Sequence, residues 1–261
     1  MKKTYLALLT IIFALLAGCT ANSNSMKRQG PPSMPAPAET KTITINNIDF
    51  RVDSTYSFFT WANLPADVPV TRLPLKSFTN VDGATHEYEV IFVKKGNLNW
   101  YQAAKLAEDA GGYLASITSE QENDFVFSLV DDEKYFWKFP RYDGRSPMNH
   151  HEIKIGPFLG GYQPEGSPEP AGNWLWLSGE KWKYENWAKD LGDGVVDKDP
   201  RNNSQPNDSG HSGFGQRVMG FGEMNKPVPT WGDYMDDVGT YGRQRTPGRC
   251  YAFIIEYPAN K

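Results

Sequence analysis

The sequence has few cysteines, few histidines and no excess of basic residues. Cys19 and Cys250 are its two cysteines, which excludes a scaffold of several disulfides and a structural zinc site that needs several thiolates. Lys and Arg number 27 against 31 Asp and Glu, a formal net charge of −4. A protein with this negative net charge is not expected to have a broad nucleic-acid-binding face. Hydrophobic residues make up 39% of the 261 residues, enough for one domain with extensions, or at most two domains.

The N-terminal apolar run is too short for a membrane-spanning helix. A basic Met-Lys-Lys start is followed by apolar residues over 5–17 and by Gly18-Cys19. About 13 apolar-rich residues cannot span a hydrocarbon core about 30 Å thick. The order basic, apolar, small is typical of an export signal. We therefore expect residues 1–18 to be a signal peptide that is removed.

The end of this run, Leu16-Ala17-Gly18-Cys19, resembles the signal of bacterial lipoproteins. In that family the Cys is lipidated and becomes the mature N-terminus, so the resemblance implies a lipid on Cys19. The alternative is an ordinary secretory peptide with an incidental Cys. Thr20 follows instead of Asp, which in Gram-negative lipoproteins favours the outer membrane. We expect an exported protein that is lipid-anchored to the cell envelope, at the outer membrane.

Residues 19–40 are predicted to be the lipidated Cys and a flexible tether. They contain Pro31, Pro32, Pro35 and Pro37 among small polar residues and show no apolar periodicity. Some twenty such residues reach roughly 25 Å from the lipid anchor. Residues 41–84 predict a β-rich extension without chemical motifs, because Thr42 to Ile45 alternates in polarity and Asn46-Asn47 is typical of a turn.

Residues 85–261 are predicted to form the main domain, which opens with two helices. Asn99 is a suitable cap for a helix that runs through Ala110 and ends at Gly111-Gly112. Its inner face would consist of Trp100, Ala103, Ala104 and Ala107. The stretch from Ser119 to Glu122 is a capping box for a second helix. The inner residues of that helix would be Phe125, Val126, Leu129 and Val130.

The remaining pattern is one of short strands and long loops. Strands are predicted at 87–92, 113–117, 158–159, 174–177, near Met219 and over 251–257. The last is an apolar run and is expected to be a central strand. His150-His151-Glu152 is expected in a solvated loop, since adjacent histidines on a strand point to opposite sides and cannot easily share a metal. Two early helices followed by strands predict an α+β fold.

Several motifs, in this order, resemble one domain family. They are Trp100-x-x-Ala103-x-x-x-Ala107-x-x-x-Gly111-Gly112-x-Leu114-x-x-Ile117, Ser119, Glu122-Asn123, Gly160-Gly161, Trp174-x-Trp176, Ser178-Gly179-Glu180, Tyr184-x-Asn186-Trp187, Gln205-Pro206-Asn207, Trp231-Gly232-Asp233 and Phe253-Ile254-Ile255-Glu256-Tyr257. Together they resemble a C-type lectin domain over roughly residues 86–258, and the leading stretch most resembles bacterial members. The resemblance implies an α+β, C-type lectin-like fold with two helices, small antiparallel sheets and long loops, here with a short N-terminal β extension.

The frequent disulfides of that family are missing here. Ala107 and Ile255 stand at the positions of one, and Val218 at a position of the second. The domain is therefore expected to be held by burial alone. Cys250 is left over, and we interpret it as a small buried hydrophobic residue; a reactive thiol beside Arg249 is the alternative.

The best candidate site follows from the resemblance. In sugar-binding members of the family, a calcium ion is held by a Glu/Gln-Pro-Asn/Asp triplet, a downstream acid and a Trp-Asn-Asp strand, and sugar hydroxyls complete its shell. Gln205 and Asn207 match the triplet, Gln216 falls at the downstream position, and Asp233 matches the acid of the strand. These four are the predicted ligand-binding residues, and Gln205, Asn207 and Asp233 are the predicted calcium ligands. Gly232 stands where the strand would carry Asn.

This set is poor in anions for calcium. Ca²⁺ prefers about 6–8 hard oxygens, several of them charged, and Arg217 adds a positive charge next to Gln216. We expect a weak calcium site or none. Other acids that would substitute if the loop folds differently are Asp208, Glu223, Asp236 and Asp237. The alternative is a Gln-Pro-Asn-Asp turn that only shapes the loop.

Two other groups of residues have simpler interpretations. One group is an acidic stretch that consists of Asp190, Asp193, Asp197, Asp199 and Asp208. Its spacing is not that of an EF-hand, and we interpret it as a solvated loop.

The other group consists of five tryptophans. They are dense enough to serve a glycan site, but large aromatic residues more often belong to the core. The resemblance implies that Trp176, Trp187 and Trp231 lie in the core, and we expect Trp182, which follows a turn, to be the most exposed.

The sequence favours recognition over catalysis. It contains no nucleophile elbow, phosphate loop or zinc-protease motif. Sulfatase-activating enzymes share a variant of the fold but use paired cysteines, and Cys250 is alone in this domain. We expect a membrane-anchored lipoprotein, not an enzyme, that binds a carbohydrate or an envelope or surface protein and no nucleic acid. The alternative is a calcium-independent docking or structural module with the same fold.

Overall fold

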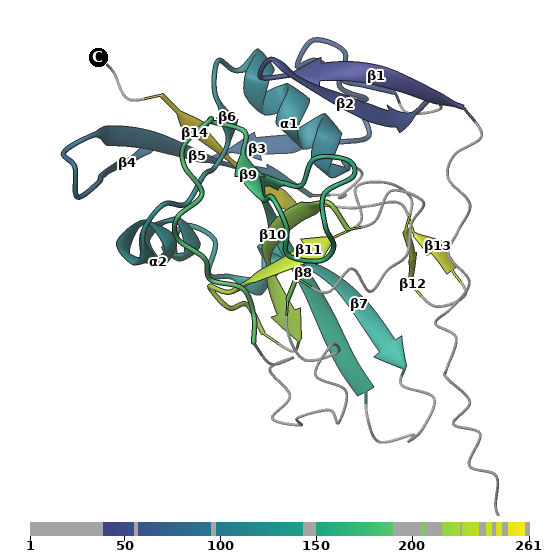
Figure 1. The fold of residues 1–261 in the computed structure, drawn as a ribbon. Coiled ribbons are helices and arrows are strands. Elements are labelled where there is room, and N and C mark those ends of the chain that lie inside the picture. The colour runs from purple at the N-terminus through teal and green to yellow at the C-terminus, as the bar shows by residue number, and fades with distance from the viewer. Residues whose placement is uncertain are drawn as a thin grey trace, which may run out of the picture. The chain divides into compact units, whose positions relative to one another are not determined.

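The computed structural model describes residues 39–54, 57–94, 98–142, 150–189, 205–206, 216–224, 226–234, 239–241, 244–246 and 250–258 (Figure 1). The predicted signal peptide, Cys19, most of the tether and Asn207 lie outside these ranges. Within them, neither helix has the length and apolar character needed to cross a membrane.

A ten-stranded sheet is the framework of the domain (Figure 1). Six strands run in the order β11-β10-β8-β14-β5-β3, while β4 pairs with β5, β6 with β14, and both β7 and β9 with β8. Their bounds are β3 (Val70–Arg72), β4 (Lys76–Thr79), β5 (Thr85–Val93), β6 (Tyr113–Leu114), β7 (Trp137–Tyr142), β8 (His150–Tyr162), β9 (Leu175–Trp176), β10 (Val218–Met224), β11 (Trp231–Tyr234) and β14 (Ala252–Tyr257). Strand β14 lies in the middle, antiparallel to β5 and parallel to β8, which confirms the predicted central strand.

Strand β14 separates two hydrophobic cores. Phe253 and Ile255 belong to the core that includes the first helix, whereas Ala252 and Ile254 belong to the core that includes the second helix. Successive side chains of a strand point to opposite faces, so a strand buried on both faces is expected to be mostly apolar. This explains the apolar run from Ala252 to Ile255, which the buried Glu256 follows.

Helix α1 (Trp100–Asp109) begins and ends as predicted. The Asn99 side chain accepts a hydrogen bond from the backbone N–H of Gln102 (2.8 Å), and the Gln102 side chain accepts one from the N–H of Asn99 (3.0 Å). This reciprocal capping box satisfies two backbone donors at the start of the helix. Gly111, with φ of +88°, follows the last turn. The predicted inner residues Trp100, Ala103, Ala104 and Ala107 are fully buried.

Helix α2 (Glu120–Ser128) differs from the prediction at its cap. The Ser119 hydroxyl accepts from the backbone N–H of Glu122 (3.2 Å), but the Glu122 carboxylate accepts from the N–H of Thr118 (2.6 Å) instead of closing on Ser119. Among the predicted inner residues, Val126 and Val130 are buried, while Phe125 and Leu129 are partly buried. A 3-10 turn, η1 (Glu133–Tyr135), follows the helix.

Two small sheets stand outside the ten-stranded sheet: β1 (Thr40–Ile45) with β2 (Ile48–Asp53), and β12 (Gly239–Tyr241) with β13 (Gln244–Thr246). The β1–β2 turn is the predicted Asn46-Asn47 pair, with φ of +49° and +62°, as tight hairpin turns require. Phe50 of β2 packs against three rings of the main domain, with centroid distances of 5.2–5.7 Å to Trp100, Tyr101 and Tyr162.

The long β7–β8 hairpin was not predicted. The predicted strand at 158–159 is only the end of β8, and His150-His151-Glu152 begins this strand, so the loop prediction was wrong. Glycine and proline within the run weaken its strand signal. The structure needs the glycine at 160, because a Cβ there would lie 2.1 Å from the carbonyl oxygen of Leu114.

No disulfide contributes to the described part of the domain. Cys250 is free and fully buried, and burial raises the pKa of its thiol, which confirms the interpretation as a buried apolar residue and makes a reactive thiolate unfavourable. Ala107 and Ile255 are fully buried in one core. Both positions are therefore held by apolar packing, as predicted.

Candidate functional site

Three of the four predicted ligand-binding residues lie among the described residues, and Asn207 does not. Gln205 is half-buried, and its backbone N–H donates to the carbonyl oxygen of Ala188 (2.7 Å). The bond between Gln205 and Pro206 is cis. The side-chain oxygen Oε1 of Gln205 is buried and has no hydrogen-bond partner among the described residues. Such an acceptor costs about 1–3 kcal/mol when left unsatisfied, so a ligand that donates to this oxygen or coordinates it would be favoured.

Strand β11 positions Asp233 on the same part of the molecule. Asp233 is 2% exposed and lies opposite Met219 of β10. The backbone N–H of Ala188 donates to the carbonyl oxygen of Trp231 (3.0 Å), two residues before Asp233. Ala188 therefore bonds to Gln205 through its carbonyl and to β11 through its N–H. The hydrogen bonds thus join Gln205 of the predicted triplet to the strand that carries Asp233.

Gln216 leads into β10, the neighbour of β11. It is 3% exposed, and the adjacent Arg217 is 6% exposed. The guanidinium Nη2 of Arg217 donates a long hydrogen bond to the Tyr101 hydroxyl (3.4 Å). Gln216, Arg217 and Asp233 all have interactions with their surroundings. We refer to Gln205, Gln216 and Asp233 as the Gln205 site.

The donors of this site fit calcium in kind but fall short in charge. A buried amide oxygen without a partner and a buried carboxylate are ligands that Ca²⁺ accepts. Gly232 supplies no side chain, and a Cβ added there would lie 2.9 Å from the hydroxyl of Tyr234. Within the described ranges, no three His, Cys, Asp or Glu side chains are grouped as a metal site. The donor set therefore suits a weak calcium site completed by other oxygens.

Five tryptophans form a packed aromatic cluster next to the site. The Trp176 and Trp182 rings stack at 4.5 Å, the Trp174 and Trp187 centroids are 4.8 Å apart, and Trp176 lies 5.6 Å from Trp231. Four of the five are buried, as predicted for Trp176, Trp187 and Trp231. Trp182 is the one that is only half-buried, and its indole N–H donates to Glu185 (2.7 Å).

Helix α2 fixes the central ring of this cluster through one side chain. The indole N–H of Trp231 donates to Oδ1 of Asn123 (2.8 Å), and Nδ2 of Asn123 donates to the carbonyl oxygen of Pro229 (3.1 Å). The Asn186 side chain donates to the same carbonyl (2.8 Å). Strand β11 and its acid are therefore held from two sides.

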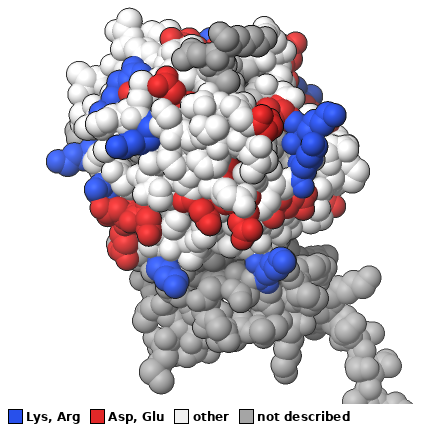
Figure 2. All heavy atoms as spheres, turned by 90° about the vertical axis from the view of Figure 1, so that its left-hand side faces the viewer, with Lys and Arg blue, Asp and Glu red and all other residues white. Residues whose placement is uncertain are grey.

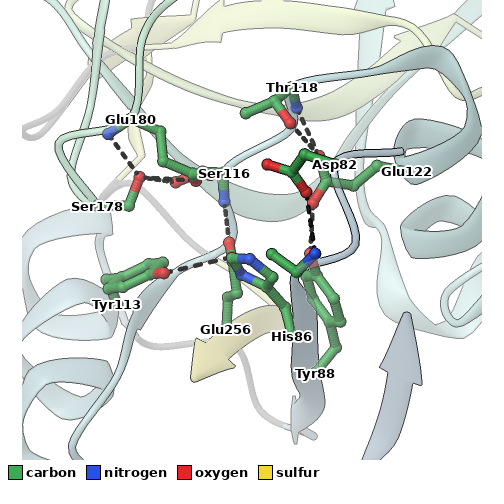
Figure 3. Close-up of polar contacts among 11 residues, drawn as sticks. Asp82, His86, Tyr88, Tyr113, Ser116, Thr118, Glu122, Ser178, Glu180 and Glu256 are labelled. Atoms are coloured by element: carbon green, nitrogen blue, oxygen red, sulfur yellow. Dashed lines mark hydrogen bonds and ion pairs between the residues drawn. The ribbon is translucent and has the colours of Figure 1, made fainter. Parts of the chain in front are cut away.

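A second polar group, which the sequence analysis missed, lies inside the domain (Figure 3). It joins strands β5, β6 and β14, helix α2 and the turn at 178–180. We call it the carboxylate cluster; its members are His86, Tyr88, Tyr113, Ser116, Thr118, Glu122, Ser178, Glu180 and Glu256 (Figure 3). The signal in the sequence was a lone Glu inside the apolar run of β14.

Glu256 is the centre of the cluster and is fully buried. Its Oε1 lies 2.5 Å from Nδ1 of His86 and 3.3 Å from the Tyr113 hydroxyl, and its Oε2 accepts from the N–H of Ser116 (2.8 Å). Burial raises the pKa of Glu256 to about 7, against the lowering effect of His86. The hydrogen bond to Glu256 raises the pKa of His86. The pair therefore holds its shared proton firmly near neutral pH.

The other two carboxylates of the cluster differ in their support. Glu122 accepts from the Tyr88 hydroxyl (2.5 Å) and from the N–H (2.6 Å) and hydroxyl (2.8 Å) of Thr118. Glu180 accepts one hydrogen bond from the Ser178 hydroxyl (3.1 Å). Burial raises the pKa of Glu180, and the negative charge of Glu122 raises it further. Glu180 is thus the least supported of the three.

The outer surface beside α2 carries charges of both signs (Figure 2). The exposed charged residues of α2 and the following turn are Glu120, Asp124, Asp131, Asp132, Glu133 and Lys134. Lys134 pairs with Asp132 at 2.7 Å. On the face that Figure 2 shows, basic side chains lie beside the acidic ones without forming a continuous basic patch.

Comparison with known proteins gives matches among solved structures. No protein-family model and no curated protein matches the sequence. Among solved structures, 14 chains match. One is the mouse scavenger receptor C-type lectin carbohydrate-recognition domain, at 17% identity over 71% of this chain and 96% of that chain, with a TM-score of 0.38. The mixed sheet and two helices confirm the α+β class, and the C-type lectin-like assignment stays a prediction.

Proposed function

We propose that this chain is a recognition lipoprotein whose C-type lectin-like domain binds a carbohydrate, or another surface ligand, at the Gln205 site. The proposal rests on one observation above all: Gln205, whose buried Oε1 has no hydrogen-bond partner among the described residues, is joined through its backbone and Ala188 to the strand that carries Asp233. The order of the sequence motifs supports the fold assignment. The role is binding, not catalysis.

Retention on an immobilised glycan panel tests this proposal. The full-length protein in mild detergent is applied with calcium and, separately, with a chelator. We expect at least one glycan class to retain it, and Gln205→Ala and Asp233→Asn to weaken that retention about tenfold or more, the equivalent of about 1.4 kcal/mol. Asp67→Asn, at an exposed acid outside the site, is the matched control and should bind as the wild type does. An unretained wild type, or retention that both site variants leave unchanged, contradicts the proposal.

A calcium-independent docking module is the second candidate. The buried Arg217 beside Gln216 favours it, because a positive charge next to the site opposes a cation. This function predicts no glycan retention, no effect of calcium, and capture of an envelope protein that Gln205→Ala and Asp233→Asn both weaken.

Within the lectin function, we propose a weak calcium site. Gln205, Asn207 and Asp233 would hold the ion, and a bound ion would offer open positions to sugar hydroxyls. Gln216 would act as a neutral neighbour of these ligands. The calcium site can be wrong while the ligand-binding function is right. If the protein still binds its ligand in the presence of a chelator, calcium is not needed for recognition.

We also propose that Cys19 carries a lipid that anchors the protein to the cell envelope, at the outer membrane. The support is the Leu-Ala-Gly-Cys sequence with Thr20 after it. Cys19→Ser is expected to release the exported protein from membranes, as measured by membrane fractionation and mass spectrometry of the N-terminal peptide. A variant that stays membrane-bound, together with a wild type that carries no lipid mass, would contradict the anchor.

A further inference from the structure

The carboxylate cluster has more negative than positive groups. The charged residues that act on Glu180 and Glu256, apart from each other, are Glu122 of α2, Asp82 of the turn before β5, and His86 of β5. The hydroxyls of Tyr88 and Tyr113 also face these carboxylates. One imidazole therefore opposes several carboxylates in a largely buried place (Figure 3). Such a group is stable only when it holds additional protons or lets a carboxylate move to water.

Glu180 is the carboxylate that can move. It is half-buried, whereas Glu122 and Glu256 are 1% and 0% exposed. A chain of hydrogen bonds connects it to the centre: Glu256 accepts from the Ser116 N–H, the Ser116 hydroxyl bonds to that of Ser178 (2.8 Å), and the Ser178 hydroxyl bonds to Glu180 (3.1 Å). The backbone N–H of Glu180 also donates to the Ser178 hydroxyl (3.2 Å).

The residues after Glu180 lead directly to the Gln205 site. Trp182 stacks on Trp176, and the backbone of Ala188 bonds to both Trp231 and Gln205. The segment 181–189 is therefore fastened at its start by the carboxylate cluster and near its end by β11. Its backbone bonds to β11 near its end, where the N–H of Trp231 also donates to the carbonyl oxygen of Asn186 (2.9 Å), so its first part is held by the contacts of Glu180 and by the packing of Trp182.

We propose that the carboxylate cluster is a proton-operated latch for residues 178–189. At mildly acidic pH the protonated cluster holds Glu180 and the segment against the sheet. At mildly alkaline pH repulsion among the carboxylates releases Glu180, and the segment loosens as far as Ala188 and its bond to Gln205. The latch follows from the geometry of the cluster and acts whatever the domain binds.

The direction of the effect follows from proton linkage. Burial raises the pKa of Glu256 to about 7 and also raises that of Glu180, while the bond to Glu256 raises the pKa of His86. All three groups bind protons more tightly in the folded state. Stability therefore decreases as pH rises wherever the folded state binds more protons than the unfolded state. For Glu256 this window lies between its ordinary value of 4.5 and about 7, and His86 extends it upward.

The latch is tested by backbone amide hydrogen exchange of the full-length protein at about pH 5.5 and about pH 8.5, in the presence of a chelator. Protection factors are corrected for the pH dependence of intrinsic exchange. We expect protection of 181–189 to fall about tenfold or more at the higher pH, the change that one unit of pKa shift represents. Protection in α1 should change less. Tryptophan fluorescence gives a second readout, because Trp182 stacks inside the aromatic cluster.

The variant Glu180→Gln removes the charge of Glu180 and so distinguishes the latch from a loss of stability that affects the whole domain at high pH. Its neutral amide can still accept from Ser178, so the segment should stay protected at both pH values. Glu87→Gln is the matched control, because residue 87 neighbours His86 on β5 but points to the other face of the strand, and it should respond as the wild type does. Equal protection at both pH values in the wild type overturns the proposal. So does an unchanged response in Glu180→Gln, or a loss of protection that is as large in α1 as in 181–189.

Discussion

Single buried polar side chains fix the geometry of the Gln205 site. Asn123 is 1% exposed and accepts from the indole N–H of Trp231 while donating to the carbonyl of Pro229. Trp231 in turn bonds through its backbone to Ala188. The helix side chain therefore sets the position of the strand that carries Asp233, although it is not one of the residues of the Gln205 site.

Replacing Asn123 by Ala is expected to destabilise the domain by about 2–4 kcal/mol, because it leaves the buried indole N–H of Trp231 without an acceptor and opens a small cavity. The neighbouring Asp124 is exposed, and Asp124→Ala should change stability by less than about 0.5 kcal/mol. Chemical denaturation of both variants measures the difference. Equal stability of the two would contradict the role of Asn123.

Residues that obey local rules could be predicted from the sequence. The Asn99 cap and the Asn46-Asn47 turn each depend on neighbours a few residues away, whereas the buried tryptophans were predicted from the resemblance to C-type lectin domains. The carboxylate cluster could not be predicted, because its partners are distant: His86 and Glu256 are separated by 170 positions. Glu122 shows most clearly that sequence spacing does not determine the partners of a side chain. Its capping-box spacing was recognised, yet its carboxylate bonds to Tyr88 and Thr118.

At the scale of elements, the β1–β2 hairpin is held to α1 by both polar and apolar contacts. The backbone N–H of Asn46 donates to the Glu108 carboxylate (2.8 Å), and the Asn46 side chain donates to the carbonyl of Gly112 (3.2 Å). Phe50 provides the apolar contact. The hairpin thereby covers the end of a helix that no disulfide ties down.

Two neighbouring residues of β2 allow this docking to be tested. Phe50→Ala is expected to cost about 3–5 kcal/mol, as truncation of a buried aromatic ring does. Arg51 points to the other face and pairs with Glu165, with both side chains about half exposed (49% and 48%). Arg51→Ala should therefore cost less than about 1 kcal/mol. The measurement is the free energy of unfolding, and similar losses in both variants would show that the hairpin does not pack as described.

Three strands are joined by one ion pair with a pH dependence opposite to that of the latch. Arg72 of β3 donates two hydrogen bonds to Glu89 of β5 (2.6 and 2.8 Å), and the hydroxyl of Tyr257 of β14 donates a third (2.7 Å). Burial acts to raise the pKa of Glu89, but the bonds from Arg72 and Tyr257 outweigh it and lower the pKa. A lowered carboxyl pKa contributes stability that is lost as pH falls through the folded value.

The variant Arg72→Met is expected to destabilise the domain by about 1–3 kcal/mol at neutral pH, because it leaves Glu89 partly buried without its cation, while the exposure of Arg72 limits the loss. The difference from the wild type should shrink at about pH 3, where Glu89 is protonated in the unfolded state. Denaturation curves at the two pH values measure it. A difference that does not depend on pH would indicate lost packing instead of a lost ion pair.

At the scale of the whole molecule, two hydrophobic cores on either side of β14 replace covalent links. Cys250 is fully buried and free, and Ala107 and Ile255 pack in the same core. The class of fold was predictable because α1 and β14 carry strong local patterns. The β7–β8 hairpin was not, since the glycines that its packing requires also remove its strand signal.

Reducing agent is therefore expected to leave the thermal stability unchanged. The melting temperature of the full-length protein with and without dithiothreitol should agree to within about 1 °C, since no covalent loop is opened. A decrease of several degrees in reduced, monomeric protein would mean that Cys250 forms a bridge, in contradiction to its free state.

The melting temperature of the full-length protein with calcium or with a chelator tests the central claim, that Gln205 and Asp233 belong to one ligand site. At a dissociation constant near 10⁻³ M, about 10 mM Ca²⁺ adds roughly 1.4 kcal/mol, a rise of about 3–5 °C for a domain of this size. Asp233→Asn should abolish the rise, and Gln205→Glu should enlarge it by adding charge at the same point. An unchanged melting temperature in both the wild type and Gln205→Glu would contradict the account and favour the metal-free docking module.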